Sequence, residues 1–388
     1  MAKWQKNFTG LAARFEDKLD NVIFNLRNRL NLFQPLQIVN YRSYGTRNRL
    51  YLKGRVLANK GITAATDKDQ IWHNLVNMYR RFETDEIPNA RLKIMFQEQE
   101  HFATTDEEGY FVINLEPKIP LEPESIWHHM VVELIDAPVP VPNGLQAKAE
   151  ILVPPVDAEY GIISDIDDTI IKTQSTDLLA MWGNVIFHNA HTRMPFAGVS
   201  AFYKSLQLGR NGKRNNPFFY VSSSPWNMYD LLQDFMDFNE IPEGPILLRD
   251  FGLEKNKLFR SDHMGHKYKE IQNILLTYPE LNFVLIGDSG QEDANIYREV
   301  VKNFPTRILA VYIRDVQLPD RAKLVEQVSE ELKEGKVEML LVDNTVKAAE
   351  HAASLGLIFN SEIPKIIKDK EKDQSPAPEA NAATGKTN

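Results

Sequence analysis

The stretch YGIISDIDDTII, residues 160–171, decides how the chain is organised. A short apolar run leads directly into Asp165, Asp167, Asp168 and Thr169, and apolar residues then resume. Acids this close together repel one another, so they do not stabilise the local fold. A buried strand with carboxylates at its exit is useful where a cation or an electrophile binds. We therefore interpret the stretch as the centre of a catalytic site.

From Tyr160 onward, apolar runs alternate with amphipathic segments. We expect strands at 160–164, 218–222, 246–249, 283–287, 307–313 and 337–342, and helices at 176–190, 198–208, 226–238, 266–278, 292–304, 319–334 and 344–356. Near-continuous apolar strands between amphipathic helices are typical of a parallel sheet covered on both faces. The sequence therefore predicts a doubly wound α/β domain, in which ligands bind beyond the carboxyl ends of the strands.

From about residue 37 to residue 155 the hydrophobic period changes to two, with one helical insertion near 69–82. Short β-rich runs bounded by turn residues predict a β-sandwich, and the segment resembles the peptidase-regulatory or transthyretin-like sandwich modules. TTDEEGYFVINL, residues 104–115, should form a strand, an acidic turn with glycine and a returning strand. Adjacent His128 and His129 would point to opposite faces of a strand, which makes a poor metal pair. We find no catalytic motif here.

The chain ends carry no core of their own. Residues 3–33 have a helical pattern with one apolar stripe and a mostly basic opposite face. This helix can pack on its own domain or on a partner, which we favour, or it can lie on a membrane surface as a peripheral contact. The last residues are charged and then rich in Pro, Ala and Asn. The expected domains are an amphipathic helix at 1–35, a β-sandwich at 36–155, an α/β domain at 156–360 and a disordered tail at 361–388.

Composition excludes several classes of protein. The net charge of −8 provides no global basic surface for nucleic acid, so we expect no nucleic-acid partner. The absence of cysteine removes disulfides, thiolate zinc sites and cysteine nucleophiles. No secretory signal is evident, and no window approaches the roughly 18 apolar residues of a membrane span. We expect a soluble, cytoplasmic protein.

Other strand exits in the α/β half also carry polar residues. Ser222 ends one predicted strand, Asp288 follows another, and Asp293 opens the next helix. Lys267 lies at the start of a further helix, and Arg249 ends the run ILLR. Because the exits of parallel strands share one edge of the sheet, these side chains should meet there. For Arg249, a substrate contact and a structural salt bridge are equally open.

Such residue types suit phosphoryl transfer. A hard cation such as Mg²⁺ takes carboxylate oxygens. A carboxylate can attack phosphorus when metal and lysine screen the phosphate charge. A second carboxylate two residues later can protonate the leaving oxygen and then activate water. We also expect the backbone to turn sharply after Asp165, which the acid-rich sequence that leaves the strand permits.

The motifs resemble those of haloacid dehalogenase superfamily phosphatases, which implies a HAD-like Rossmannoid fold. The four motifs of that superfamily are Asp-x-Asp-x-Thr, a strand ending in Ser or Thr, a lysine at a helix start, and an acidic motif after a strand. The matching residues, in order, are Asp165, Asp167 and Thr169; Ser222; Lys267; and Asp288 with Asp293. Four motifs in order are a far more specific signal than one.

A narrower resemblance covers about residues 157–358. SDIDDTIIKT, YVSSSPWNMYDLLQDF, GPILLRDFG, the HK pair and FVLIGDSGQEDANIYREV are similar to the catalytic domain of the actin-patch type of phosphatidate phosphatase. This resemblance implies Mg²⁺-dependent hydrolysis of a phosphomonoester through an aspartyl-phosphate, with phosphatidate giving diacylglycerol. The implied roles are nucleophile for Asp165; general acid and base for Asp167; phosphate or substrate binding for Ser222, Lys267, Thr169 and Arg249; and Mg²⁺ binding for Asp165, Asp288, Asp293 and the backbone carbonyl of Asp167.

Alternatives remain open at this stage. The substrate can instead be a small soluble phosphorylated metabolite, and the apolar segment at 172–215 should decide between them. A non-catalytic scaffold would have lost a motif residue, and none is lost. Asp168 has no firm role, and Ser224, just before Pro225, is expected to cap the following helix.

Overall fold

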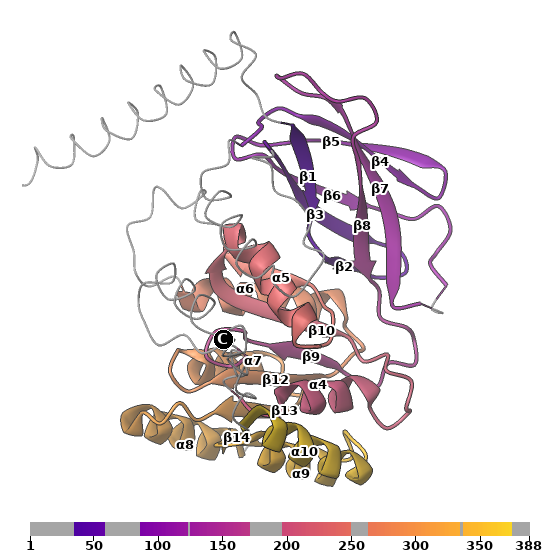
Figure 1. The fold of residues 1–388 in the computed structure, drawn as a ribbon. Coiled ribbons are helices and arrows are strands. Elements are labelled where there is room, and N and C mark those ends of the chain that lie inside the picture. Colours follow the sequence, from indigo (N-terminus) through magenta and orange to yellow (C-terminus); the bar gives the residue numbers. More distant parts are fainter. Residues whose placement is uncertain are drawn as a thin grey trace, which may run out of the picture.

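The computed structural model describes residues 35–58, 86–122, 125–170, 196–249, 263–333 and 337–374. The predicted helices at 3–33, 69–82 and 176–190 lie outside the described residues. The described chain contains an eight-stranded sheet and a six-stranded sheet, which Figure 1 shows in separate parts of the molecule. The chain is therefore multidomain, as predicted. Within the described residues, no helix combines the length and the hydropathy needed to cross a bilayer.

The first sheet contains all the strands of the N-terminal half that the structure describes. They are β1 (Leu36–Asn40), β2 (Ser43–Gly45), β3 (Leu50–Ala58), β4 (Arg91–Phe96), β5 (Gln99–Thr104), β6 (Tyr110–Leu115), β7 (Trp127–Asp136) and β8 (Gln146–Leu152). Pairing links them in the order β1-β3-β2-β8-β7-β4-β5, with β6 on β3, and only β2 and β8 run parallel. The strands predicted from the period of two are confirmed. That this sheet closes into a sandwich stays a prediction.

The acidic turn after β5 forms as predicted, but it does not close a hairpin. The Asp106 carboxylate accepts hydrogen bonds from the backbone N–H groups of Glu108 and Tyr110, at 3.0 and 2.8 Å. The strands on either side then pair with different neighbours, β5 with β4 and β6 with β3. In the second pair Gly54 lies opposite Phe111, whose ring occupies the space that a Cβ would fill. This close packing joins β6 to β3.

The second sheet is parallel throughout. Its strands and the helices around it are β9 (Gly161–Ser164), α4 (Val199–Leu208), β10 (Phe218–Pro225), α5 (Tyr229–Phe238), β11 (Ile246–Arg249), α6 (His263–Thr277), β12 (Phe283–Asp288), α7 (Asp293–Asn303), β13 (Ile308–Arg314), α8 (Pro319–Lys333), β14 (Met339–Val342), α9 (Thr345–Ser354) and α10 (Ile363–Gln374). The strand order is β11-β10-β9-β12-β13-β14. Chain order thus reverses between β9 and β12, as in doubly wound sheets.

Helices cover both faces of this sheet. Neighbouring residues of β9 point in opposite directions, so Ile162 packs in one apolar cluster with Phe202 of α4. Ile163 packs in the other cluster, with Ile274 of α6 and Val300 of α7. Because both faces are covered, the edge at which the strands end is the place left for a ligand.

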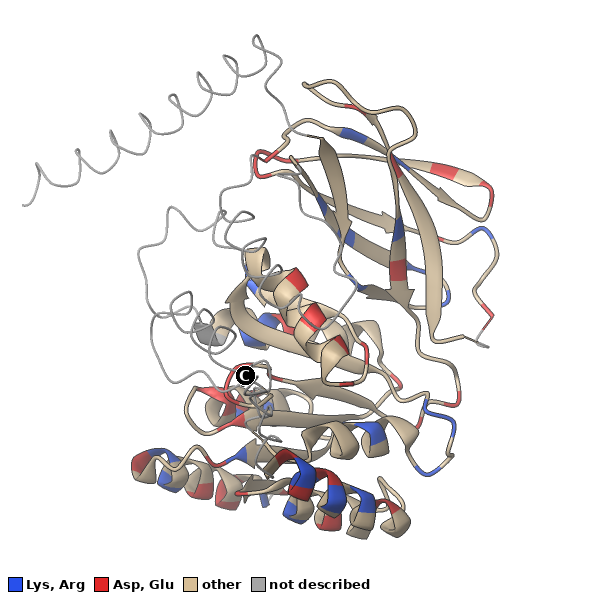
Figure 2. Cartoon of the chain, viewed as in Figure 1, with Lys and Arg blue, Asp and Glu red and all other residues tan. Residues whose placement is uncertain are grey.

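Helix α10 corrects the predicted disordered tail at 361–388. Ile366 is fully buried against the α/β domain. Asp369 and Asp373 accept hydrogen bonds from the backbone N–H groups of Ala201 and Gly198, at 3.0 and 2.8 Å, at the start of α4. The acids of this charged segment, visible in Figure 2, therefore cap another helix. Residues 375–388 lie outside the described part of the chain.

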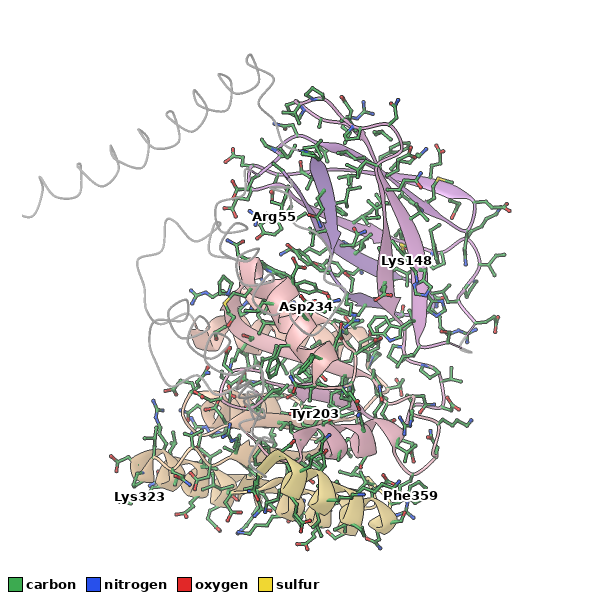
Figure 3. All side chains as sticks on the ribbon, viewed as in Figure 1. Arg55, Lys148, Tyr203, Asp234, Lys323 and Phe359 are labelled. Carbon is green, nitrogen blue, oxygen red and sulfur yellow. The ribbon has the colours of Figure 1, made fainter. Side chains whose placement is uncertain are left out.

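The two domains meet through the segment between β1 and β3. The Tyr41 ring lies 4.5 Å from both Trp226 and Tyr229, measured between ring centroids. The Tyr278 hydroxyl donates to the Gly45 carbonyl at 3.0 Å. Arg55 of β3, labelled in Figure 3, reaches across to the side-chain oxygen of Asn227 at 2.8 Å. These contacts fix the eight-stranded sheet against the α/β domain.

Candidate active site

The acid-rich turn lies where the strand order reverses. The backbone N–H of Asp165 donates to the carbonyl of Ile286 at 2.8 Å, which joins the end of β9 to β12. Asp288 is the last residue of β12. Asp165 and Asp288 therefore leave adjacent strands at the topological switch point, the usual position of ligands in such sheets.

A sharp turn follows Asp165, as predicted. Asp168 has a left-handed backbone with φ +54°, which is uncommon outside glycine. Arg314 of β13 donates a hydrogen bond to the Asp168 carbonyl. Asp168, to which the sequence assigns no firm role, is thus the residue of this turn that takes the left-handed conformation.

Lys267, in the first turns of α6, holds two of the acids. Its Nζ lies 2.8 Å from Asp165 Oδ1 and 2.8 Å from Asp293 Oδ1. All three side chains are almost completely buried. Burial alone lowers the pKa of Lys267, but Asp165, Asp293 and Asp288 outweigh it and raise the pKa well above its usual value. The charged form of Lys267 is therefore favoured beside two carboxylates.

Three acids can share one cation. Carboxylate oxygens of Asp165, Asp288 and Asp293 all lie within 4.8 Å of one another. Asp288 Oδ1 accepts backbone hydrogen bonds from Gly290 and Gln291, at 2.6 and 3.0 Å, whereas the buried Oδ2 has no hydrogen-bond partner within the described residues. Burial, aided by Asp293, raises the pKa of Asp288 to about 7. This buried set of hard oxygen donors, with its excess negative charge, fits a divalent cation such as Mg²⁺.

Asp167 is held by two serines rather than one. Its Oδ2 accepts hydrogen bonds from Ser222 Oγ at 2.6 Å and Ser224 Oγ at 3.2 Å. Burial raises the pKa of Asp167, and the Ser222 and Ser224 hydroxyls partly oppose that rise. The predicted helix cap at Ser224 is wrong, because Pro225 occupies the cap position. The period of two along the strand could have revealed Ser224, since residues 222 and 224 share a face.

The remaining predicted site residues divide into two groups. Thr169 Oγ1 donates to Asp165 Oδ2 at 3.3 Å, so it joins the acid cluster. Arg249 instead ends β11 and lines a cavity with His266, and none of the clustered acids lines that cavity. The structure thus brings together all the predicted residues except Arg249, whose contact with phosphate stays a prediction.

Comparison with known proteins finds a family model that matches part of the α/β domain. Residues 160–315 match the family described as "Phosphatidate phosphatase APP1, catalytic domain". The resemblance predicted from the sequence is confirmed. This APP1-like segment begins just before β9 and ends just after Arg314, so it contains every residue of the acid cluster.

Two curated relatives match about the same length of chain. "Phosphatidate phosphatase APP1" of Saccharomyces cerevisiae is 37% identical over 155 residues, which is 40% of this chain and 25% of that protein. "Uncharacterized protein C29B5.04c" of Schizosaccharomyces pombe is 30% identical over 167 residues, or 42% of this chain and 26% of that protein. The matched part thus spans about a quarter of either relative.

Solved structures add no argument. A ferredoxin-NADP⁺ reductase mutant from Plasmodium falciparum aligns with 72% of this chain and 94% of its own length, but the TM-score is 0.18 at 9% identity. The APP1-like assignment therefore rests on sequence similarity and on the position of the acid cluster.

Proposed function

We propose that the acid cluster hydrolyses phosphomonoesters with Mg²⁺, and that phosphatidate, which gives diacylglycerol, is the favoured substrate. The observation that carries the proposal is the buried set of Asp165, Asp288, Asp293 and Lys267 at the switch point of a parallel sheet. The name of the yeast relative supports the substrate. A HAD-like fold for the α/β domain and a sandwich fold for the eight-stranded sheet belong to the same proposal.

Mg²⁺ would be held by the carboxylates of Asp165, Asp288 and Asp293 and by the backbone carbonyl of Asp167. When bound, the ion would offset the negative charge of the phosphate and of the acids. Lys267 would add a second positive charge on the side of Asp165 and Asp293, where its Nζ already lies. Ser222, close to Asp167, would donate to a phosphate oxygen once substrate is bound.

In the first step an Asp165 carboxylate oxygen forms a bond to phosphorus as the bond to the ester oxygen breaks. Asp167 gives its proton to that leaving oxygen, and burial favours its protonated form by raising its pKa. In the second step Asp167 takes a proton from water as the water oxygen attacks phosphorus. Asp165 is released as a carboxylate, and inorganic phosphate leaves.

The reaction is tested by replacing the nucleophile. Asp165→Asn should abolish Mg²⁺-dependent release of nitrophenol from p-nitrophenyl phosphate, because an amide does not attack phosphorus as a carboxylate does. Asp320→Asn, an exposed acid in the first turn of α8, is the matched control and should keep full activity. Undiminished turnover by the Asp165 variant would exclude the mechanism.

The substrate is tested separately. Phosphatidate in mixed micelles should give a higher kcat/KM than soluble sugar phosphates and nucleotides. A clear preference for one of the soluble esters would leave the proposed reaction unchanged but would make a soluble metabolite, rather than phosphatidate, the substrate.

We also propose a cytoplasmic location, with the N-terminal helix predicted at 3–33 packed on its own domain or on a partner. Peripheral contact with membrane is the alternative: if the helix is an anchor, deletion of residues 1–34 should weaken flotation with liposomes that contain phosphatidate. Unchanged flotation together with lower solubility would support packing of this helix on protein.

A further inference from the structure

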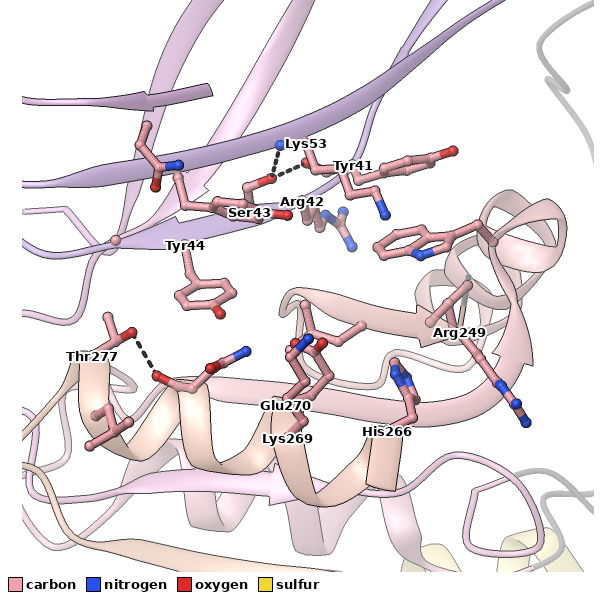
Figure 4. A pocket seen from close by; sticks show the side chains of 18 of the residues that line it. Tyr41, Arg42, Ser43, Tyr44, Lys53, Arg249, His266, Lys269, Glu270 and Thr277 are labelled. Atoms are coloured by element: carbon pink, nitrogen blue, oxygen red, sulfur yellow. Dashed lines mark hydrogen bonds between the residues drawn. The ribbon is translucent and has the colours of Figure 1, made fainter. Parts of the chain in front are cut away.

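A large cavity lies between the two domains, apart from the acid cluster. Its volume is about 960 Å³, which is at the upper end of the range of ligand pockets. One wall consists of residues between Tyr41 and Lys53 with Asn114 of β6, and the facing wall consists of α6, β11 and Trp226, which follows β10. Figure 4 shows Tyr44 reaching from the first wall toward α6, and Glu270 and His266 extending from α6 toward that wall. None of the acids of the candidate active site lines this cavity.

The charged lining of the cavity is mostly positive. It consists of Arg42, Arg49, Lys53, Arg249, Lys269 and the acid Glu270. Arg42 is already held by Glu150 at 3.3 Å and Asp237 at 3.2 Å, so its charge is largely neutralised within the protein. Lys269 and Arg49 are exposed, and they belong to opposite walls. A bound anion would therefore be contacted by both domains.

The Glu270 carboxyl repels a bound anion only to the extent that it is ionised. Burial raises its pKa, while hydrogen bonding to Asn273 and the charges of Lys269 and Lys53 lower it. The carboxyl also affects Tyr44 and Tyr51 across the cavity, since both have pKa values raised first by burial and then by Glu270. Among the residues that line the cavity, Glu270 is thus the one acid beside several cations.

Aromatic and aliphatic side chains form another part of the lining. The rings of Tyr44 and Tyr51 lie 5.7 Å apart, and the Lys53 ammonium lies 4.1 Å from the centroid of the Trp226 ring. Leu247 and Leu276 add aliphatic surface. A ligand with both a negative charge and an apolar group would use cations and rings together, whereas inorganic phosphate alone would use only the cations.

The cavity adjoins the elements that carry the candidate catalytic residues. Trp226 follows Ser224 after one proline, and His266 immediately precedes Lys267. Helix α6 therefore contributes to both the active site and the cavity, from opposite sides. Lys267 contacts Asp165 in the active site, whereas Lys269 lines the cavity. A ligand in the cavity would bind beside the active site without contacting its acids.

We propose that this interdomain cavity binds a phosphate ester that carries an apolar group, with Lys269 and Arg49 contacting the phosphate and the aromatic rings contacting the apolar part. The proposal does not rest on the proposed hydrolysis. The phosphate ester can come from a lipid or from a soluble molecule, and the two sources are separated by the probes below.

The experiment measures binding by calorimetry to the full chain in EDTA, which prevents Mg²⁺-dependent turnover. The probes are dioctanoyl phosphatidate, adenosine 5′-monophosphate, inorganic phosphate and dioctanoylglycerol. At least one of the two esters should bind about tenfold more tightly than inorganic phosphate or dioctanoylglycerol, because only the esters use both kinds of lining. Binding by phosphatidate identifies a lipid source, and binding by the nucleotide identifies a soluble source.

Two variants that should change the affinity for the ester in opposite directions test the site. Lys269→Glu should weaken ester binding about tenfold, since it replaces a charge-assisted contact by repulsion. Glu270→Gln should strengthen it severalfold, because it removes the opposing acid. Lys323→Glu is the matched control, on the exposed side of α8 and labelled in Figure 3, and should leave the affinity unchanged. Trp226→Phe should remove most of the ligand-induced change in tryptophan fluorescence.

The proposal is overturned if neither ester binds, or if the Lys269 and Glu270 variants bind as the wild type does. It is also overturned if the Lys323 control changes affinity as much as Lys269→Glu. If the esters bind in the cavity but hydrolysis does not depend on Asp165, only the proposed function is contradicted. Intact hydrolysis without cavity binding would contradict this inference alone.

Discussion

The two sheets differ in what they do with buried polar side chains. Within the described residues, those buried in the eight-stranded domain are Ser43, Arg55 and Thr105, and each makes hydrogen bonds within the protein framework. In the α/β domain, by contrast, Asp165, Asp288 and Asp293 are buried with one lysine between them. A fold gains no stability from burying excess charge of one sign. The difference is that the first domain uses its buried polar groups within the framework, whereas the second also gathers buried charge at the proposed site.

The largest expected effect is on activity and concerns Asp288. Asp288→Asn should lower Mg²⁺-dependent turnover by at least about a thousandfold, because it removes a carboxylate from the proposed metal site. The same variant should leave the metal-free protein folded, since it removes one of several like charges. Thermal unfolding with and without Mg²⁺ checks this: the ion should raise the Tm of the wild type and not that of the variant. Equal stabilisation of both proteins by Mg²⁺ would contradict the metal role of Asp288.

The next effect is on stability and concerns the lysine. Lys267→Met should destabilise the α/β domain by about 3–5 kcal/mol, because it leaves buried carboxylates without their cation. Urea unfolding measures the loss, with Lys323→Met as an exposed control. Adding Asp293→Asn to the Lys267 variant should recover part of the stability, since one unpaired charge is then removed. A double variant less stable than Lys267→Met alone would show that Lys267 does not act by balancing these acids.

A comparable test in the other domain should affect stability but not chemistry. Thr105 Oγ1 donates to the carbonyl of Ile87 at 2.7 Å and accepts from the backbone N–H of Ala90 at 2.8 Å. Thr105→Val keeps the shape and leaves both buried groups unsatisfied, so it should cost about 2 kcal/mol. Its exposed neighbour Thr104 provides the control, and Thr104→Val should change stability by less than about 0.5 kcal/mol. A change in kcat for Thr105→Val would contradict the division between structural and chemical polar groups.

Sequence patterns predict those features of the site that depend on residues close together in the chain. Asp165 and Asp288 could be placed on one edge because each follows an apolar strand, and parallel strands end on the same side. The strand order that puts these two strands side by side is not local, since it depends on how helices pack across the sheet. The second serine on Asp167 was missed because the proline after Ser224 also fits a helix start.

Contacts between distant segments account for the other differences. The acids of α10 cap α4 from a position more than a hundred residues later in the chain, so composition alone indicated disorder. The cavity between the domains likewise depends on how the two walls that carry Tyr44 and Lys269 face each other, and neither residue lies in a recognisable motif. Patterns of spacing describe strands and helices, but they do not describe how two domains face each other.

The smallest expected effect concerns two tyrosine hydrogen bonds, one between the domains and one within the α/β domain. Tyr278 donates to the Gly45 carbonyl at 3.0 Å across the interface, and Tyr297 donates to the Ile286 carbonyl at 2.8 Å inside the α/β domain. Replacing either tyrosine by phenylalanine removes the same kind of hydrogen bond and should lower the free energy of unfolding by about 1 kcal/mol.

Calorimetric unfolding distinguishes the two variants. Tyr297→Phe should shift the transition of the α/β domain and keep its shape, whereas Tyr278→Phe should broaden or split the profile, because the domains then unfold less cooperatively. Identical profiles for the two variants would mean that this bond does not couple the domains, and that their other contacts, such as those of Tyr41 and Arg55, join them without it.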